Sequence, residues 1–214
     1  MTVEPQSRVR SAWHRKLVKM RQSCKTWSRL CRPPPVIRLR PGPGYLGMMI
    51  SALDIAVYGI AQGRLEIELY PTAPDDLASH FVGLCEGSFG VSYIGTGFFG
   101  VIPGVALWGG DIQLNNGQGN YIGIPQVHLP YPPLRLAGPG YLAGTPHPNG
   151  FGSQFTLTLD ESGADHLRYG TVFGRVRNLE SAIFNALQAV GGHGGSGTRS
   201  LPERLIQIIG CGVP

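Results

Sequence analysis

Apolar and polar residues alternate with a period of two in several short segments of the chain, which is typical of strands with one buried face. The alternation is clearest in residues 64–69, where Leu and Ile are separated by Glu, and residues 53–57 alternate just before them. Glycines at positions 59 and 63 favour a hairpin between the two segments. Further short strands are predicted at residues 100–107, 140–143, 154–159, 171–176 and 204–209.

Two segments carry apolar residues at helical spacing instead. The first follows a helix start at residues 74–76, ends at Gly87, and buries Leu77, Phe81, Leu84 and Cys85. The second covers residues 179–190, with Asn178 as a candidate N-cap. Many short strands with two isolated helices favour a mainly β fold, a closed β-barrel with a helix over each open end.

The first part of the chain has a different pattern. Between residues 8 and 31 the apolar residues form one stripe of a helix, and Arg and Lys fill its other faces. The stripe consists of Trp13, Leu17, Met20, Cys24, Trp27 and Cys31. Three prolines from Pro33 end this helix, and residues 40–44 indicate a linker. We therefore predict a basic helical extension with its linker at residues 1–47 and a barrel domain at residues 48–214.

Charge separates the same two parts. Residues 1–40 contain eleven Lys and Arg against one acid, Glu4, whereas residues 41–214 contain seven Arg and twelve acids. The basic arm has several interpretations: a helix that binds an acidic protein partner, a nucleic-acid arm, or a mitochondrial presequence. A helix that packs on its own domain and a poorly ordered extension are the alternatives.

Composition and residue spacing exclude several classes of protein and site. Hydrophobic residues make up 42% of the chain and charged residues 14%, which excludes a disordered chain. We expect no metal and no cofactor, because the four Cys and six His lack the spacing of metal ligands. No apolar run reaches the length of a membrane span, and the N-terminus lacks the apolar stretch of a secretory signal. We expect a cytoplasmic protein, with the mitochondrion or the nucleus as alternatives; nothing in the sequence indicates an oligomeric state.

A series of motifs then occurs in the order and nearly the spacing of one known family. They are "LDIAVYGIAQGRLEIELYPTAP", "LASHFVGLCEG", "FFGVIPGVALWGGD", "AGPGYLA", "GSQFTLTL", "TVFGRV" and "IIGCG". Residues 53–213 thus resemble the cyclophilin-type peptidyl-prolyl cis-trans isomerases. The resemblance implies a closed eight-stranded antiparallel barrel capped by two α-helices, and an apolar pocket in which family members rotate an X–Pro bond.

The catalytic positions depart from the family pattern. The family's F-H-R-V-I-P motif supplies an Arg that donates to the prolyl nitrogen, but here Phe99 replaces the His and Gly100 replaces the Arg. Loss of one preorganised donor typically costs a factor of about 100 to 1000, so we predict no catalytic residue. Trp108 is either compensation, with its indole filling the space beside Gly100, or a plain core aromatic; both interpretations predict a buried indole.

The peptide pocket that the resemblance implies is altered as well. Val105 and Ala106 replace an aromatic–Met pair, Trp108 replaces a Gln, and Thr156 replaces a Phe. The far wall, residues 165–169, has neither the Trp nor a well-placed His of the family. The candidate peptide-binding residues of this degenerate pocket are Gly100, Val105, Ala106, Trp108, Thr145, His147, Gln154, Phe155 and Thr156.

Three hypotheses follow for the function. The first is a pseudo-enzyme, a cyclophilin-like scaffold or protein-interaction module that binds Pro-containing segments with little or no isomerase activity. The second is a residual prolyl isomerase that assists protein folding with an unfamiliar set of groups. The third is a nucleic-acid or assembly factor that acts through the basic arm.

Overall fold

The computed structural model describes residues 49–71, 77–119, 121, 138–147, 150–167, 170–194 and 197–213. The predicted N-terminal helix and linker, and the predicted helix start at residues 74–76, lie outside these residues. The strands are β1 (Met49–Val57), β2 (Ile60–Leu69), β3 (Gly100–Ile102), β4 (Ala106–Gly109), β5 (Tyr141–His147), β6 (Gly150–Thr158), β7 (Thr171–Val176) and β8 (Ile206–Gly212). The helices are α2 (Leu77–Glu86), α3 (Ala182–Gln188) and the 3₁₀ helix η2 (Glu161–Leu167).

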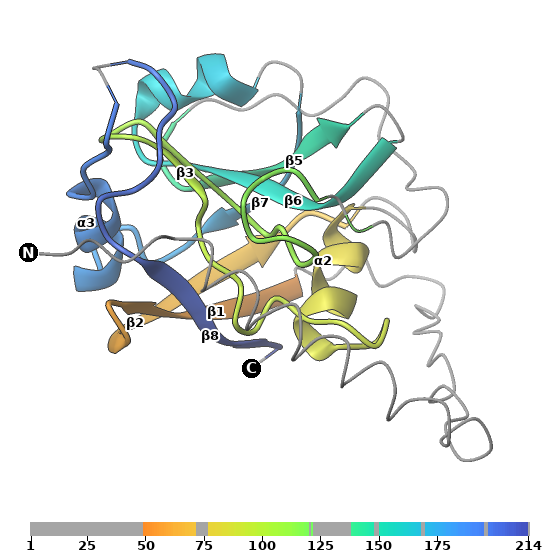
Figure 1. Ribbon diagram of the computed structural model, residues 1–214. Coiled ribbons are helices and arrows are strands. Elements are labelled where there is room, and N and C mark those ends of the chain that lie inside the picture. The colour runs from red at the N-terminus through yellow and green to blue at the C-terminus, as the bar shows by residue number, and fades with distance from the viewer. Residues whose placement is uncertain are drawn as a thin grey trace, which may run out of the picture. The chain divides into compact units, whose positions relative to one another are not determined.

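The strands form one curled antiparallel sheet in the order β3-β4-β6-β5-β7-β2-β1-β8 (Figure 1). The sequence predicts a closed barrel; the structure shows a curled half-barrel with β3 and β8 at its two ends, and residues 95–98, which precede β3, bond to β8. The N–H of Gly95 donates to the carbonyl of Ile208 over 2.7 Å, and the N–H of Phe98 donates to that of Ile206 over 3.0 Å. The described part is therefore mainly β, with eight antiparallel strands and two α-helices.

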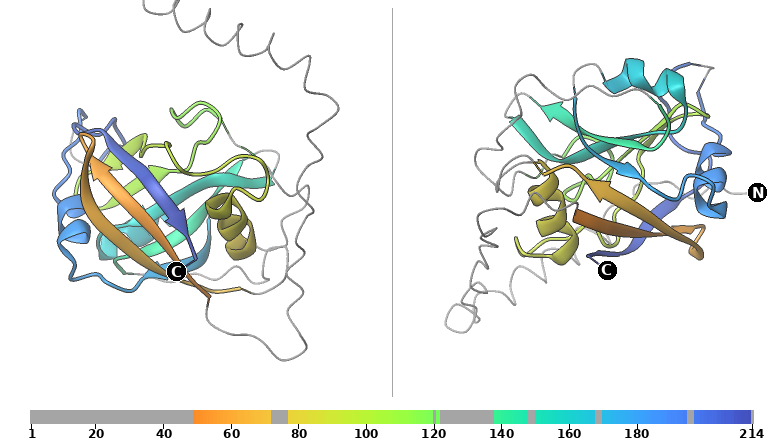
Figure 2. Two further views of the ribbon diagram at one scale, coloured as in Figure 1. Left: turned by 90° about the horizontal axis from the view of Figure 1, so that it is seen from below. Right: turned by 180° about the vertical axis from the view of Figure 1, so that it is seen from behind.

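The two α-helices lie on opposite sides of the curled sheet, as Figure 2 shows from two directions. Helix α2 packs against β6, β7 and β8, and α3 packs against β2. The prediction of the first helix is confirmed over residues 77–86. The second begins later than predicted, because its N-cap is Ser181, whose hydroxyl accepts from the N–H of Phe184. Asn178, the expected cap, instead bonds the backbone of β2 at Glu66 and Arg64.

Turns set the boundaries of the strands. Tyr58 and Gly59 both have positive φ, of 51° and 76°, and they form a tight two-residue connection between β1 and β2. The hairpin is thus shorter than the predicted turn, and Gly63 lies within β2. The single strand predicted at residues 100–107 is two strands, since the chain turns at Gly104, where φ is 71°.

Aromatic rings fill the centre of the core. The ring of Phe155 lies 5.8 Å from that of Phe81, 5.5 Å from that of Tyr93 and 6.0 Å from that of Phe98. Phe173 completes the group from β7, with its ring 5.3 Å from that of Phe81. Aromatic pairs at such separations contribute roughly 0.5–1.5 kcal/mol beyond the area they bury. This cluster holds α2 against the sheet.

His80 makes the stability of the fold depend on pH. It is 1% exposed on α2, and its burial lowers the pKa of the imidazole to about 4. The unfolded state therefore binds a proton to this histidine more tightly than the folded state does. The contribution of His80 to the free energy of unfolding is fully present above about pH 6.5 and is lost as the pH falls towards 4. We predict that His80 alone lowers the free energy of unfolding by roughly 3 kcal/mol over this interval. Urea unfolding at several pH values measures it.

A matched pair of variants isolates the effect. In His80→Gln the loss of stability between pH 6.5 and 4 should be smaller than in the wild type. In His193→Gln, which changes an exposed His, it should stay unchanged. Equal pH dependence in the wild type and His80→Gln would contradict the prediction.

Candidate functional site

The strand register places three of the predicted site residues in one row across the sheet. Gly100 on β3 is opposite Trp108 on β4, and Trp108 is opposite Thr156 on β6. Opposite residues of antiparallel strands share a face. Their chain neighbours Leu107 and Leu157 belong to the core, so the row lies on the outer face of the sheet.

A small apolar cluster covers this outer row. It consists of the buried residues Phe99, Ile102, Ala106 and Trp108, with Val105 packed against them. Trp108 is 7% exposed. The ring of His166 on η2 meets the Trp108 indole edge-on, with 5.8 Å between the ring centres. The predicted far wall, residues 165–169, thus brings His166 against Trp108, while the prediction that it lacks the family's peptide-binding His stays a prediction.

The structure brings together most of the predicted site residues. Gly100, Val105, Ala106, Trp108 and Thr156 meet at the outer cluster. Thr145 joins them from β5, because its hydroxyl lies 3.4 Å from the Thr156 hydroxyl. The side chain of His147 lies outside the described part of the structure.

Two predicted site residues have other roles. Phe155 was expected in the peptide pocket, but its side chain is 1% exposed in the core, because side chains alternate along β6. Gln154 binds the loop at residues 111–119. Its amide nitrogen donates to the carbonyls of Gly117 and Gly119. Neither side chain is available to a peptide in this conformation.

Asp111 organises that loop. Its carboxylate accepts from the backbone N–H groups of Gln113, Leu114, Asn116, Gly117 and Gly119, over 2.8–3.2 Å. Burial raises the pKa of Asp111, but these hydrogen bonds outweigh it and hold the pKa below its usual value. The loop is thereby fixed beside the outer cluster.

Sequence reasoning missed one member of the site, Arg199. The backbone of Ser200 pairs with Val101 of β3 through two hydrogen bonds of 2.8 and 2.9 Å, which positions Arg199 beside the outer face. The central carbon of its guanidinium lies 5.0 Å from the ring centre of Phe99 and 5.2 Å from that of Trp108. Both separations are those of cation–π contacts.

Arg199 occupies the space that the glycine leaves. A Cβ on Gly100 would lie 2.7 Å from Nε of Arg199, so no larger residue fits there without moving the arginine. The nearest atoms to this position all belong to Arg199, so the arginine, and not only the predicted Trp108 indole, fills the space beside Gly100. No local signal in the sequence connects Arg199 with Gly100, because they meet only through the pairing of Ser200 with Val101.

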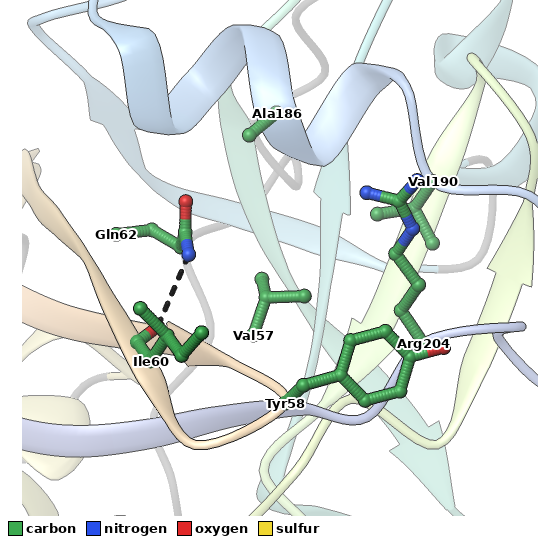
Figure 3. A pocket seen from close by; sticks show the side chains of 7 residues that line it. All are labelled: Val57, Tyr58, Ile60, Gln62, Ala186, Val190 and Arg204. Carbon is green, nitrogen blue, oxygen red and sulfur yellow. Dashed lines mark hydrogen bonds between the residues drawn. The ribbon is translucent and has the colours of Figure 1, made fainter.

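A separate pocket lies away from this row (Figure 3). It has a volume of about 170 Å³ and is lined by Val57, Tyr58, Ile60, Gln62, Ala186, Val190 and Arg204. The Tyr58 hydroxyl donates to the carbonyl of Glu203 over 2.9 Å, and the Gln62 amide donates to that of Ile60. Ligand pockets usually measure about 300–1000 Å³. This hollow is therefore smaller than a usual ligand pocket.

The comparison with protein families agrees with the motif pattern. A family model described as "Cyclophilin type peptidyl-prolyl cis-trans isomerase/CLD" matches residues 52–213. This match covers most of the chain, and the protein belongs to the cyclophilin-type peptidyl-prolyl isomerase family. Among the described residues, no three His, Cys, Asp or Glu side chains gather as a metal site, and no helix is long and apolar enough to cross a membrane.

The contact between Gly100 and Arg199 predicts an energetic coupling. In an Arg199→Ala background, Gly100→Ala should stabilise the protein by roughly 0.5–1 kcal/mol, since a strand glycine costs about that much in chain entropy. In the wild type the same change should be neutral or destabilising, because the new Cβ displaces the guanidinium. Urea unfolding of the four proteins gives the coupling, which we expect to be of order 1 kcal/mol. An equal effect of Gly100→Ala in both backgrounds would contradict the contact.

Proposed function

We propose that this protein is a cyclophilin-like interaction module that binds a Pro-containing segment of another protein, with little or no prolyl isomerase activity. The observation that carries the proposal is the covered outer row. Trp108 is 7% exposed and contacts both the Arg199 guanidinium and the His166 ring. An indole packed in this place leaves little depth for a twisted proline, so a bound segment would lie across the site instead of entering it.

The chemistry of the row supports the loss of activity. Resonance in an ordinary peptide bond sustains a barrier of about 18–20 kcal/mol to rotation. Lowering it requires a donor aimed at the prolyl nitrogen and walls that hold the twisted form. Gly100 offers no side chain, and Val105, Ala106 and Thr156 are smaller than the residues the family pattern has there.

A residual isomerase is the second candidate, and Arg199 is the observation that favours it. Its guanidinium lies against Gly100, where the family pattern has an Arg. Its two ring contacts argue against this role, because they hold the group over Phe99 and Trp108. The two candidates therefore differ in what removal of Arg199 does to the rate.

An isomerase assay on an X–Pro peptide separates these candidates. For the interaction module we predict a kcat/KM below about 10⁴ M⁻¹ s⁻¹, under the usual range for enzymes, and no change on Arg199→Ala. The same peptides should bind, and peptides with Ala in place of Pro should bind more weakly. A kcat/KM above that value that falls at least tenfold in Arg199→Ala would favour the residual isomerase.

The basic arm at residues 1–47 carries a third proposal, supported by its composition alone. We propose that its apolar stripe binds an acidic protein partner while Arg and Lys remain outward; nucleic acid is the alternative ligand. The cytoplasm is the proposed compartment, and a mature chain trimmed at its N-terminus would instead indicate a mitochondrial presequence.

Changing Trp13 and Trp27 together to Ser tests the arm. We predict that partner capture is weakened while the melting temperature of the barrel stays the same, because two large apolar side chains leave the stripe. Cooperative unfolding of the barrel in the double variant would mean that the helix belongs to the domain. Salt-sensitive binding of nucleic acid that the double variant leaves unchanged would favour nucleic acid as the ligand of the arm.

A further inference from the structure

Arg199 is held as a fixed cation at the rim of the outer row. Phe99 and Trp108 each present a ring to its guanidinium, at 5.0 and 5.2 Å. Two glycines leave room for it, since a Cβ on Gly100 would lie 2.7 Å from Nε and one on Gly117 would lie 2.9 Å from a terminal nitrogen. Such restraint reduces the entropy that a long side chain loses when it binds a ligand.

Within the described residues this cation has no acidic partner. The ion pair found there joins Arg64 and Asp54, on β2 and β1. Asp111 belongs to the loop that contains Gly117, but both of its oxygens accept backbone N–H groups. Burial against the rings lowers the pKa of Arg199 from its ordinary value, yet the group remains charged at neutral pH.

A guanidinium prefers a planar acceptor with two oxygens. Its fork of N–H donors matches a carboxylate in a paired geometry, and stacking on aromatic rings uses its faces and leaves those edges free. The side chains around Trp108 are apolar: Ile102 and Ala106 are buried beside it, and Val105 is partly buried. The site therefore combines one exposed cation with apolar packing beneath it.

We propose that Arg199 binds a carboxylate of the bound segment, so that the preferred ligands are acidic, Pro-containing peptides. This inference rests on the proposed function for the peptide, while the carboxylate site itself is independent of it. Arg199 would then make the site prefer acidic Pro-containing segments over neutral ones. A free dicarboxylate such as glutarate binds the same group weakly, without the apolar contacts.

The test uses blocked peptides with one Pro and a Glu moved through each flanking position, each paired with its Gln counterpart. Binding is followed by fluorescence in the full chain carrying Trp13→Phe and Trp27→Phe, where Trp108 is the remaining Trp. We expect at least one Glu peptide to bind about tenfold more tightly than its Gln counterpart, as a charged hydrogen-bonded pair at a partly exposed site allows.

Two variants test whether Arg199 causes the preference for Glu peptides over Gln peptides. Arg199→Met keeps an apolar stem and should abolish the difference between Glu and Gln peptides. Arg177→Met removes an exposed arginine and should leave the difference intact. Equal affinities for Glu and Gln peptides at every position, or a preference that survives Arg199→Met, would overturn the proposal.

Glutarate tests the carboxylate site at Arg199 separately from peptide binding. If no peptide binds, the proposed function fails; quenching of Trp108 by millimolar glutarate, absent in Arg199→Met, would still support the carboxylate site. No peptide binding and no glutarate effect would overturn both. Tighter binding of inorganic phosphate than of glutarate would show a general anion site and would also overturn the proposal.

Discussion

The packing of Phe155 against Phe81, Tyr93 and Phe98 fixes which way β6 faces. Side chains alternate along a strand, so a shift of one residue would reverse both faces. With Phe155 inside, Thr156 faces outward. The register of β6 with β4, and of β4 with β3, then carries that orientation to Trp108 and Gly100. The outer row therefore depends on this aromatic packing in the core.

On that row, the guanidinium beside β3 comes from another segment of the chain. The motif pattern places the family's Arg at Gly100, and Arg199, in the segment that precedes β8, lies against that glycine. The two residues are linked physically, because a side chain at position 100 and the observed position of Arg199 exclude each other. Its guanidinium contacts the rings of Phe99 and Trp108, and such contacts leave the N–H edges of an arginine free for an acceptor.

Much of the fold follows from local pattern, and the missed features are long-range. The alternation at residues 64–69 predicts β2, and helical spacing predicts α2. The cap of α3 is misassigned to Asn178 because Asn caps helices and also bonds strand backbones, a choice that tertiary contacts decide. Strand alternation places the side chain of Phe155 in the core. The motif GSQFTLTL alone does not show whether this side chain faces the core or the peptide pocket. Arg199 and His166 reach the site only through folding.

The central claim is that the outer row, with Trp108 and Arg199 in place of a β3 arginine, is where a Pro-containing segment binds. Two-dimensional NMR of the full chain, titrated with an acidic Pro-containing peptide, tests this most directly. The account predicts that the largest shifts occur at the backbone N–H groups of Gly100, Trp108 and Thr156, the Trp108 indole N–H and Nε–H of Arg199. Shifts centred instead on the pocket at Tyr58 and Arg204, or no shifts at all, would contradict it.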